Sequence, residues 1–92
     1  MTEKEKMMSG QLYQAGGPEL SKERTEAIKI VKTFNKSSPE DTNIRIGLLQ
    51  KLVGSSGKNF WIEPPFFCDY GYNIHVGDDV FFNFNCVILD VT

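Results

Sequence analysis

The side chains best suited to metal and redox chemistry are scarce in this sequence: one histidine, His75, and two cysteines, Cys68 and Cys86. Protein zinc sites take three or four ligands, drawn mostly from histidine and from cysteines in Cys-x-x-Cys pairs. The sequence has no such pair, so we expect no metal cofactor. His75 stands between Ile74 and Val76 in an alternating apolar and polar run, which predicts a structural imidazole that points to solvent.

The composition argues against several classes of function. The 92 residues, 40% hydrophobic and 24% charged, are typical of one soluble domain or part of one. A net charge of −2 argues against nucleic acid as a partner, because binding to phosphates depends on clustered lysine and arginine. The opening stretch MTEKEKMM lacks the apolar core of a secretory signal, and no apolar run approaches the roughly 20 residues that span a bilayer. We therefore expect a cytoplasmic protein with no membrane partner and two free thiols.

The elements that must position any site begin with three predicted helices in residues 1 to about 53. Thr2 and Glu5 have the spacing of a capping box at the start of the first helix. Ser38 is the expected N-cap of the third helix, with Pro39 at its first position. The apolar face of the second helix comprises Leu20, Ala27, Ile28, Val31 and Phe34. The apolar face of the third comprises Ile44, Leu48, Leu49 and Leu52.

The second half of the chain, after a GSSGK hinge or loop at Gly54–Lys58, has a period of six residues. Turn-forming Asp or Asn recurs at the same step, as at Asp79 and Asn85. Three hexapeptides make a coil of eighteen residues, so the pattern predicts a parallel β-helix, although a pair of hairpins would also fit. His75, Asp79 and Asn85 are expected at the surface. The predicted inward columns are Ile62, Cys68, Ile74, Val80, Cys86 and Thr92, and Val76, Phe82 and Ile88.

Three stretches of the sequence resemble the maltose and galactoside O-acetyltransferases of the hexapeptide-repeat acyltransferase superfamily: MTEKEKMMSGQLY, the pair Phe34–Asn35, and EPPFFCDYGYNIHVGDDVFFNFNCVILDV. The resemblance implies an α+β fold, with a short helical cap in residues 1–57 and the first coils of a left-handed parallel β-helix in residues 58–92. It further implies a homotrimer that transfers an acetyl group from acetyl-CoA to a sugar hydroxyl. The intact protein is expected to be about twice this length, so the chain corresponds to a truncated, N-terminal half.

The same resemblance assigns roles to individual residues. Asp69 matches a position that contacts the acceptor sugar, and a carboxylate can accept hydrogen bonds from two vicinal hydroxyls. Asn83 matches an asparagine at the acetyl-transfer site, where its amide can donate to an oxyanion. Tyr13 and Asp90 match positions near the acceptor. The family's histidine base lies beyond Thr92, so we expect no catalytic base in this chain. Turn capping for Asp69 and a wall or turn amide for Asn83 are the structural alternatives.

Two classes of function follow. The first is a sugar O-acetyltransferase; the second is a non-catalytic, truncated paralogue that serves as an interaction module. A β-helical metalloenzyme of the carbonic anhydrase type needs about three histidine ligands and is excluded by the single histidine. Gln14 and Ala15 stand where many family members carry an acidic group, so the sequence does not select the acceptor sugar.

Overall fold

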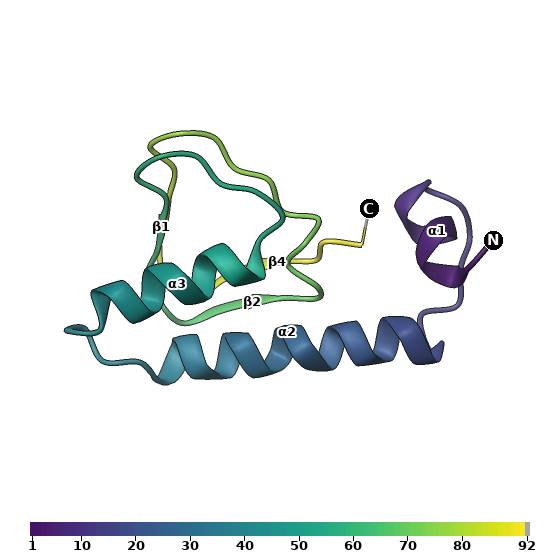
Figure 1. Cartoon of the computed structure of the whole chain (residues 1–92), viewed down its shortest axis with the longest axis horizontal. Helices are drawn as coiled ribbons and strands as arrows, with labels where there is room; N and C mark the ends of the chain where they lie inside the picture. Colours follow the sequence, from purple (N-terminus) through teal and green to yellow (C-terminus); the bar gives the residue numbers. More distant parts are fainter. Residues whose placement is uncertain (92) are drawn as a thin grey trace.

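The computed structural model describes residues 1–91, which form a helical cap and a coil of short strands (Figure 1). The helices are α1 (Glu3–Met8), α2 (Pro18–Lys36) and α3 (Thr42–Leu52). The strands are β1 (Trp61–Ile62), β2 (Phe66–Cys68), β3 (Phe81–Phe82) and β4 (Cys86–Ile88). Within the described part of the chain, every helix is too short or too polar to cross a membrane.

The first helix begins as the sequence predicts. The Glu5 N–H donates to Thr2 Oγ1 at 3.0 Å and the Thr2 N–H donates to Glu5 Oε1 at 3.1 Å, so the capping box is confirmed.

In α2, the predicted apolar face is buried except at Ile28, which is 49% exposed. Ile28 lies about 100° around the helix from Ala27, beyond the stripe that contacts the rest of the molecule. The buried residues of α2 are Leu20, Ala27, Val31 and Phe34.

The third helix begins later than predicted, at Thr42 with Asp41 as its N-cap. The Ser38 N–H donates to Asp41 Oδ2 at 3.0 Å and the Asp41 N–H donates to the Ser38 carbonyl at 2.9 Å. The expected first turn of the helix is therefore a separate turn around Pro39, and the prediction of Ser38 as N-cap was wrong. The Asp41 carboxylate, three residues after Ser38, accepts from the Ser38 N–H and so stabilises this turn in place of a first helical turn.

The buried face of α3 also differs from the prediction at one position. Leu49 and Leu52 are buried as predicted and Leu48 is half-buried, but Ile44 is 56% exposed. Arg45 is buried instead. Its Nε donates to Ser37 Oγ at 2.7 Å and its guanidinium donates to the Ser37 carbonyl at 2.9 Å. The cation thus stabilises the C-terminal end of α2, where carbonyl groups lack helical partners.

The strands pair in parallel and form two turns of a three-sided coil. One face pairs β1 with β3, a second pairs β2 with β4, and the third holds a parallel bridge between Ser55 and His75. The Ser55 bridge lies within the GSSGK segment, so this predicted hinge or loop also contributes to the first turn of the coil.

The register shows a coil longer than the predicted eighteen residues. Ser55 pairs with His75 and Trp61 pairs with Phe81, in each case twenty positions apart. The first two sides of the coil keep the six-residue step, from Ser55 to Trp61 to Phe67, whereas the step from Phe67 to His75 is eight. The additional residues lie in the third corner, Asp69–Asn73. As a result Ile62 lies beside Phe82, and the predicted column through Ile62 and Val80 is shifted by two residues.

The inward columns are buried unevenly along the coil. Ile62 and Ile74, in the first turn, are buried as predicted. The members in the second turn are only half-buried, namely Val80, Phe82, Cys86 and Ile88. The reason is that, within residues 1–91, no further strand covers the outer edge of that turn. Thr92 lies outside the described residues. His75, Asp79 and Asn85 are exposed as predicted, and the φ angles of +57° at Asp79 and +62° at Asn85 confirm both as turn residues.

The cap is joined to the coil by a core and by one asparagine. Figure 1 shows α2 running alongside β2. The Asn35 amide of α2 donates to the Phe66 carbonyl at 3.0 Å, and the Phe66 N–H donates to Asn35 Oδ1 at 2.8 Å. This amide thus pairs with β2 as a neighbouring strand would. The shared core comprises Ala27, Val31, Phe34, Leu49, Leu52, Val53, Ile62, Phe66 and Ile74.

Candidate functional site

The third corner of the coil, Asp69–Asn73, presents Asp69, one of the predicted acceptor-binding residues. The Asp69 side chain is half-buried and accepts no hydrogen bond from residues 1–91. The corner turns at Gly71, whose φ of +88° favours glycine. A Cβ at Gly71 would lie 2.4 Å from the Leu52 carbonyl oxygen, so the corner rests directly on the end of α3.

Asp90, also predicted near the acceptor, lies inside this corner. It is 5% exposed, and both carboxylate oxygens accept hydrogen bonds from the corner's backbone. The structure therefore brings Asp90 and Asp69 together, but it turns the Asp90 carboxylate toward the protein. This geometry does not place the Asp90 carboxylate in direct contact with a sugar.

The helical cap covers the other side of the corner. Arg24 of α2 donates to Tyr70 Oη at 2.9 Å, and the rings of Tyr70 and Tyr72 stack at 5.3 Å. Lys4 Nζ of α1 lies 4.8 Å from the centre of the Tyr72 ring. Tyr13 is half-buried against the cluster that contains Tyr70. Tyr13 and the corner that carries Asp69 are thus packed in one region.

The loop that carries Tyr13 is fixed to α1 by a carboxylate. The Gln14 N–H donates to Glu3 Oε2 at 2.7 Å. That hydrogen bond, aided by Lys6 at 3.2 Å, lowers the pKa of Glu3. The loop is therefore anchored beside the corner, which limits the positions that Tyr13 can occupy.

Two buried polar atoms lie at the junction between cap and corner. Glu23 Oε2 and Tyr72 Oη are buried and have no hydrogen-bond partner among the described residues. Burial raises the pKa of the Tyr72 hydroxyl, and the Glu23 carboxylate acts in the same direction. The other Glu23 oxygen accepts from Lys4 Nζ at 2.8 Å. The raised pKa keeps the Tyr72 hydroxyl protonated at this junction.

Asn83 lies at a different corner, between β3 and β4, and is exposed. Its Oδ1 accepts a hydrogen bond from the Phe84 N–H at 2.9 Å, which leaves the Nδ2 hydrogens to donate outward. Strand β4 separates Asn83 from Asp90, so a single chain does not bring the amide of Asn83 to the Asp69 corner. The geometry suits both a turn residue and a donor to a bound group.

His75 is exposed on the outer wall, where its Nδ1 lies 2.9 Å from Ser55 Oγ of the preceding turn. This contact links adjacent turns of the coil, in keeping with the predicted structural role. No group of three or more His, Cys, Asp or Glu residues within residues 1–91 is arranged to hold a metal ion. Cys68 and Cys86 are free. Burial, with the nearby Asp90 and Asp69 carboxylates, raises the pKa of Cys68 to about 12, so this thiol is protonated and unreactive.

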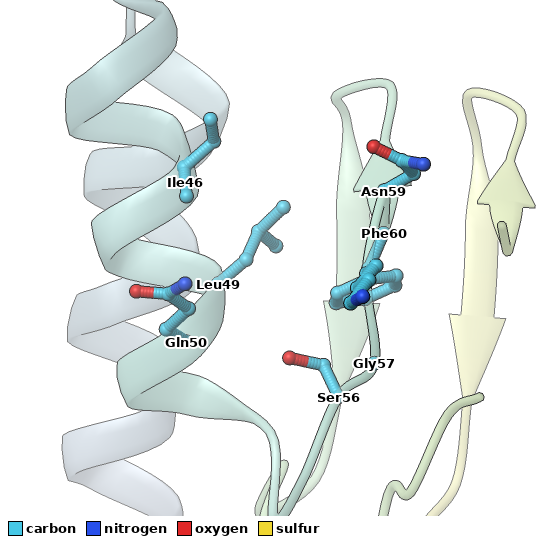
Figure 2. A pocket seen from close by; sticks show the side chains of 8 residues that line it. Ile46, Leu49, Gln50, Ser56, Gly57, Asn59 and Phe60 are labelled. Carbon is cyan, nitrogen blue, oxygen red and sulfur yellow. The ribbon is translucent and has the colours of Figure 1, made fainter. Parts of the chain in front are cut away.

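A surface hollow of about 370 Å³ lies between α3 and the coil segment that follows it (Figure 2). Figure 2 shows Ile46, Leu49 and Gln50 of α3 on one side of it and the segment from Ser56 to Phe60 on the other. None of the predicted site residues lines this hollow. We therefore place the candidate site at the Asp69–Asn73 corner.

Several residues of the site were missed in the sequence. Arg24 and Lys4 contact the corner from helices that lie far from it in the chain, and no local pattern marks them. Gly71 could have been found, because a glycine within the polar and aromatic run DYGYN is typical of a turn that needs positive φ. The role of Asn73, whose Nδ2 donates to the Asp90 carbonyl at 2.8 Å, depends on the register of the coil.

The cap, the coil and the corner between them occur together in solved acetyltransferases. A maltose O-acetyltransferase from Clostridium difficile 630 is 46% identical, with a TM-score of 0.97 over 99% of this chain and 49% of that one. A hexapeptide-repeat containing acetyltransferase from Vibrio cholerae O1 biovar eltor, complexed with acetyl-CoA, is 34% identical, with a TM-score of 0.89 over 100% of this chain and 49% of that one. The fold is thus that of the hexapeptide-repeat acetyltransferases.

The family itself follows from the helical half of the chain. Residues 6–57 match the model of the maltose acetyltransferase hexapeptide capping motif, and the chain belongs to this family. Among curated relatives, the galactoside O-acetyltransferase of Escherichia coli (strain K12) is 33% identical over 86 residues, which cover 94% of this chain and 42% of that protein. The chain spans about half the length of the curated relatives it matches. The predicted resemblance is thereby confirmed.

Proposed function

We propose that this chain is the acceptor-binding part of an acetyl-CoA-dependent O-acetyltransferase that acts on a sugar hydroxyl. The observation that carries the proposal is the packing of α1 and the Tyr13 loop onto the corner that presents the half-buried Asp69. At this junction of cap and coil, the Asp69 carboxylate is available to accept hydrogen bonds from the hydroxyls of a sugar. The solved relatives support the co-substrate, since one of them is complexed with acetyl-CoA.

The chemistry assigns different tasks to the two polar residues. Acetyl-CoA supplies the acetyl group as a thioester, whose carbonyl carbon is attacked by the acceptor hydroxyl. The carbon–sulfur bond then breaks, and CoA leaves as a thiolate that takes up a proton. Asp69 accepts hydrogen bonds from acceptor hydroxyls and so orients the attacking oxygen. The outward Nδ2 hydrogens of Asn83 are suited to donate to the oxyanion that forms on the carbonyl oxygen. The hydroxyl proton goes to a base outside residues 1–91, because His75 is on the outer wall.

The proposal extends to the assembly and location of the whole protein. We propose a homotrimer, because strongly exposed apolar side chains on the outer wall of the coil need a partner surface. Two of them, Phe67 and Val87, are adjacent on neighbouring strands, at 49% and 61% exposure. We further propose that the coil continues as a left-handed parallel β-helix. The two free thiols support a cytoplasmic location.

Substitutions in the full-length protein that contains residues 1–92 test the two roles. Asn83→Ala should lower kcat by about 10²-fold, which is the usual effect of losing one oxyanion donor. Asp69→Asn should raise the KM for the acceptor with little change in kcat. Asn43→Ala, which removes an exposed amide on α3, is the matched control and should change neither. Small, equal effects on kcat and KM from both site substitutions would refute the assigned roles.

Residues 1–92 alone should neither acetylate sugars nor form the trimer. Acetylation is not expected because the resemblance places the family's histidine base beyond Thr92. An ordinary carboxylate such as Asp69, with a pKa near 4 in model peptides, would be a poor substitute for that base. An assay for released CoA, combined with analytical ultracentrifugation, measures both properties. Turnover above background by a discrete trimer would show that the base is misplaced.

A further inference from the structure

Four of the five backbone N–H groups of the third corner converge on one side chain. Asp90 Oδ1 accepts from the N–H groups of Asp69 at 3.1 Å and Tyr70 at 2.9 Å. Asp90 Oδ2 accepts from those of Gly71 at 2.6 Å and Asn73 at 3.2 Å. Successive N–H groups turned inward in this way form an anion-binding nest. Here the anion is a side chain of the same protein, twenty residues further along the chain.

Among the described residues 1–91, the nest supplies all the hydrogen bonds that this carboxylate accepts. Asp90 is 5% exposed, and within residues 1–91 neither salt bridge involves it. A buried carboxylate without a cation needs several strong donors, and charge-assisted hydrogen bonds from backbone N–H groups are about twice as strong as neutral ones. Within the described part of the chain these N–H groups donate to no other acceptor, so the corner and the carboxylate depend on each other.

The nest acts where the coil departs from its regular step. The regular corners of the coil repeat every six residues, whereas Asp69–Asn73 holds the two additional ones. A longer corner has more conformations open to it, and the Asp90 carboxylate selects one by fixing four of its N–H groups. Asp69 is the first residue of this corner, and its own N–H is one of the four.

We propose that Asp90 is a positioning residue for acceptor binding: its carboxylate fills the backbone nest of the Asp69–Asn73 corner and thereby sets the direction of the Asp69 side chain. Asp90 itself does not touch the acceptor, in contrast to its expected place among the substrate-binding residues. The inference rests on the proposed role of Asp69 in binding the acceptor. It adds a second carboxylate to the site with a different task.

Asp90→Asn in the full-length protein is a sharp test, because asparagine has the size of aspartate but only one of its two terminal atoms accepts. Its NH2 group would face two N–H donors and push part of the corner away. We expect the KM for the acceptor to rise at least about 10-fold, with the KM for acetyl-CoA unchanged and kcat changed less than about 3-fold. Asp78→Asn is the matched control, since Asp78 Oδ1 accepts from the Lys58 N–H at 2.7 Å in an exposed corner. It should leave both KM values unchanged.

Amide hydrogen exchange separates a local effect on the corner from a loss of folding. In Asp90→Asn, the amides of residues 69–73 should exchange faster. The Trp61 amide, which donates to the Val80 carbonyl at 3.0 Å, should stay protected. Asp90→Ala offers a chemical rescue, because added formate can occupy the emptied nest and should lower the acceptor KM again. Chloride at the same ionic strength should not.

Each result bears on a defined part of the reasoning. An unchanged acceptor KM in Asp90→Asn, while Asp69→Asn raises it, would overturn the inference and leave the proposed function intact. Equal losses in kcat and both KM values, with faster exchange throughout the chain, would reduce Asp90 to a general folding role. Absence of sugar acetylation by the wild-type full-length protein would overturn the proposed function, and with it the role of Asp90.

Discussion

Removal of the Asn35 side chain should weaken the attachment of the helical cap to the coil. In Asn35→Ala, the N–H and C=O groups of Phe66 both lose their partner, although Phe66 is fully buried. Each buried backbone group left without a hydrogen bond costs about 1–3 kcal/mol. Both hydrogen bonds are part-buried, so water offsets some of the loss, and we expect the free energy of unfolding to fall by about 2–4 kcal/mol. A domain of this size has about 5–15 kcal/mol in total.

Two further variants show which half of the interaction matters. Asn35→Asp keeps the oxygen that accepts from the Phe66 N–H but turns a second carboxylate oxygen toward the Phe66 carbonyl, so this repulsion should make it at least as destabilising as Asn35→Ala. Asn43→Ala, on the exposed side of α3, should stay within about 0.5 kcal/mol of the wild type.

Urea unfolding, followed by the fluorescence of Trp61, the one tryptophan in the sequence, measures these differences. The midpoint should shift while the slope with denaturant stays constant, because the surface exposed on unfolding is nearly the same. A change below about 1 kcal/mol in Asn35→Ala would contradict the argument. So would an Asn35→Asp variant clearly more stable than Asn35→Ala, because the donor to the Phe66 carbonyl would then contribute nothing.

Three other predictions concern the corner and its surroundings. Gly71→Ala should lower stability by at least about 3 kcal/mol, because a Cβ would lie 2.4 Å from a backbone oxygen at a φ of +88°, whereas Gly77→Ala, with nothing within 4 Å, should be nearly neutral by thermal melting. The pKa of Cys68 is raised to about 12 from an ordinary 9.0, so its thiol should react with iodoacetamide at pH 8 about 10³-fold more slowly than a free thiol. The stability of the fold should decrease as pH rises from 9 toward 12, because only the unfolded thiol ionises in that range. Equal labelling rates for Cys68 and a free thiol would refute this prediction. Tyr72→Phe removes a buried hydroxyl that has no partner within residues 1–91, so the chain should be as stable or slightly more stable in urea, and a loss above about 1 kcal/mol would show that the hydroxyl is bonded.

The parts of the fold that were predictable are those encoded by neighbouring residues. The capping box at Thr2 and the alternation around His75 depend on spacings of two to four residues, and both appear in the structure. The start of α3 was missed because Ser38 and Asp41 are both good caps and only the folded backbone selects between them.

The candidate site was less predictable, because its contacts join distant segments. The two additional residues of the third corner interrupt the period of six, and the interruption is visible only from the pairing of the strands. The role of Asp90 depends on that register, since a coil of eighteen residues would have placed it elsewhere. Asn35 lies 31 positions from its partner and has no local signal. Side chains that pair with backbone across the fold are set by topology.

The order in which the ribosome synthesises the Asp69–Asn73 corner and Asp90 has a consequence for folding during translation. The corner's amides precede Asp90 by about twenty residues, and ribosomes add about 5–20 residues per second. For about 1–4 seconds, the nascent chain therefore carries the helical cap and the first turn of the coil while the corner's amides have only water to bond. The cap can dock early through Asn35, whereas the corner becomes ordered only when the second turn arrives. A codon change that slows synthesis between residues 74 and 90 would lengthen this interval and the exposure of the first turn's apolar edge.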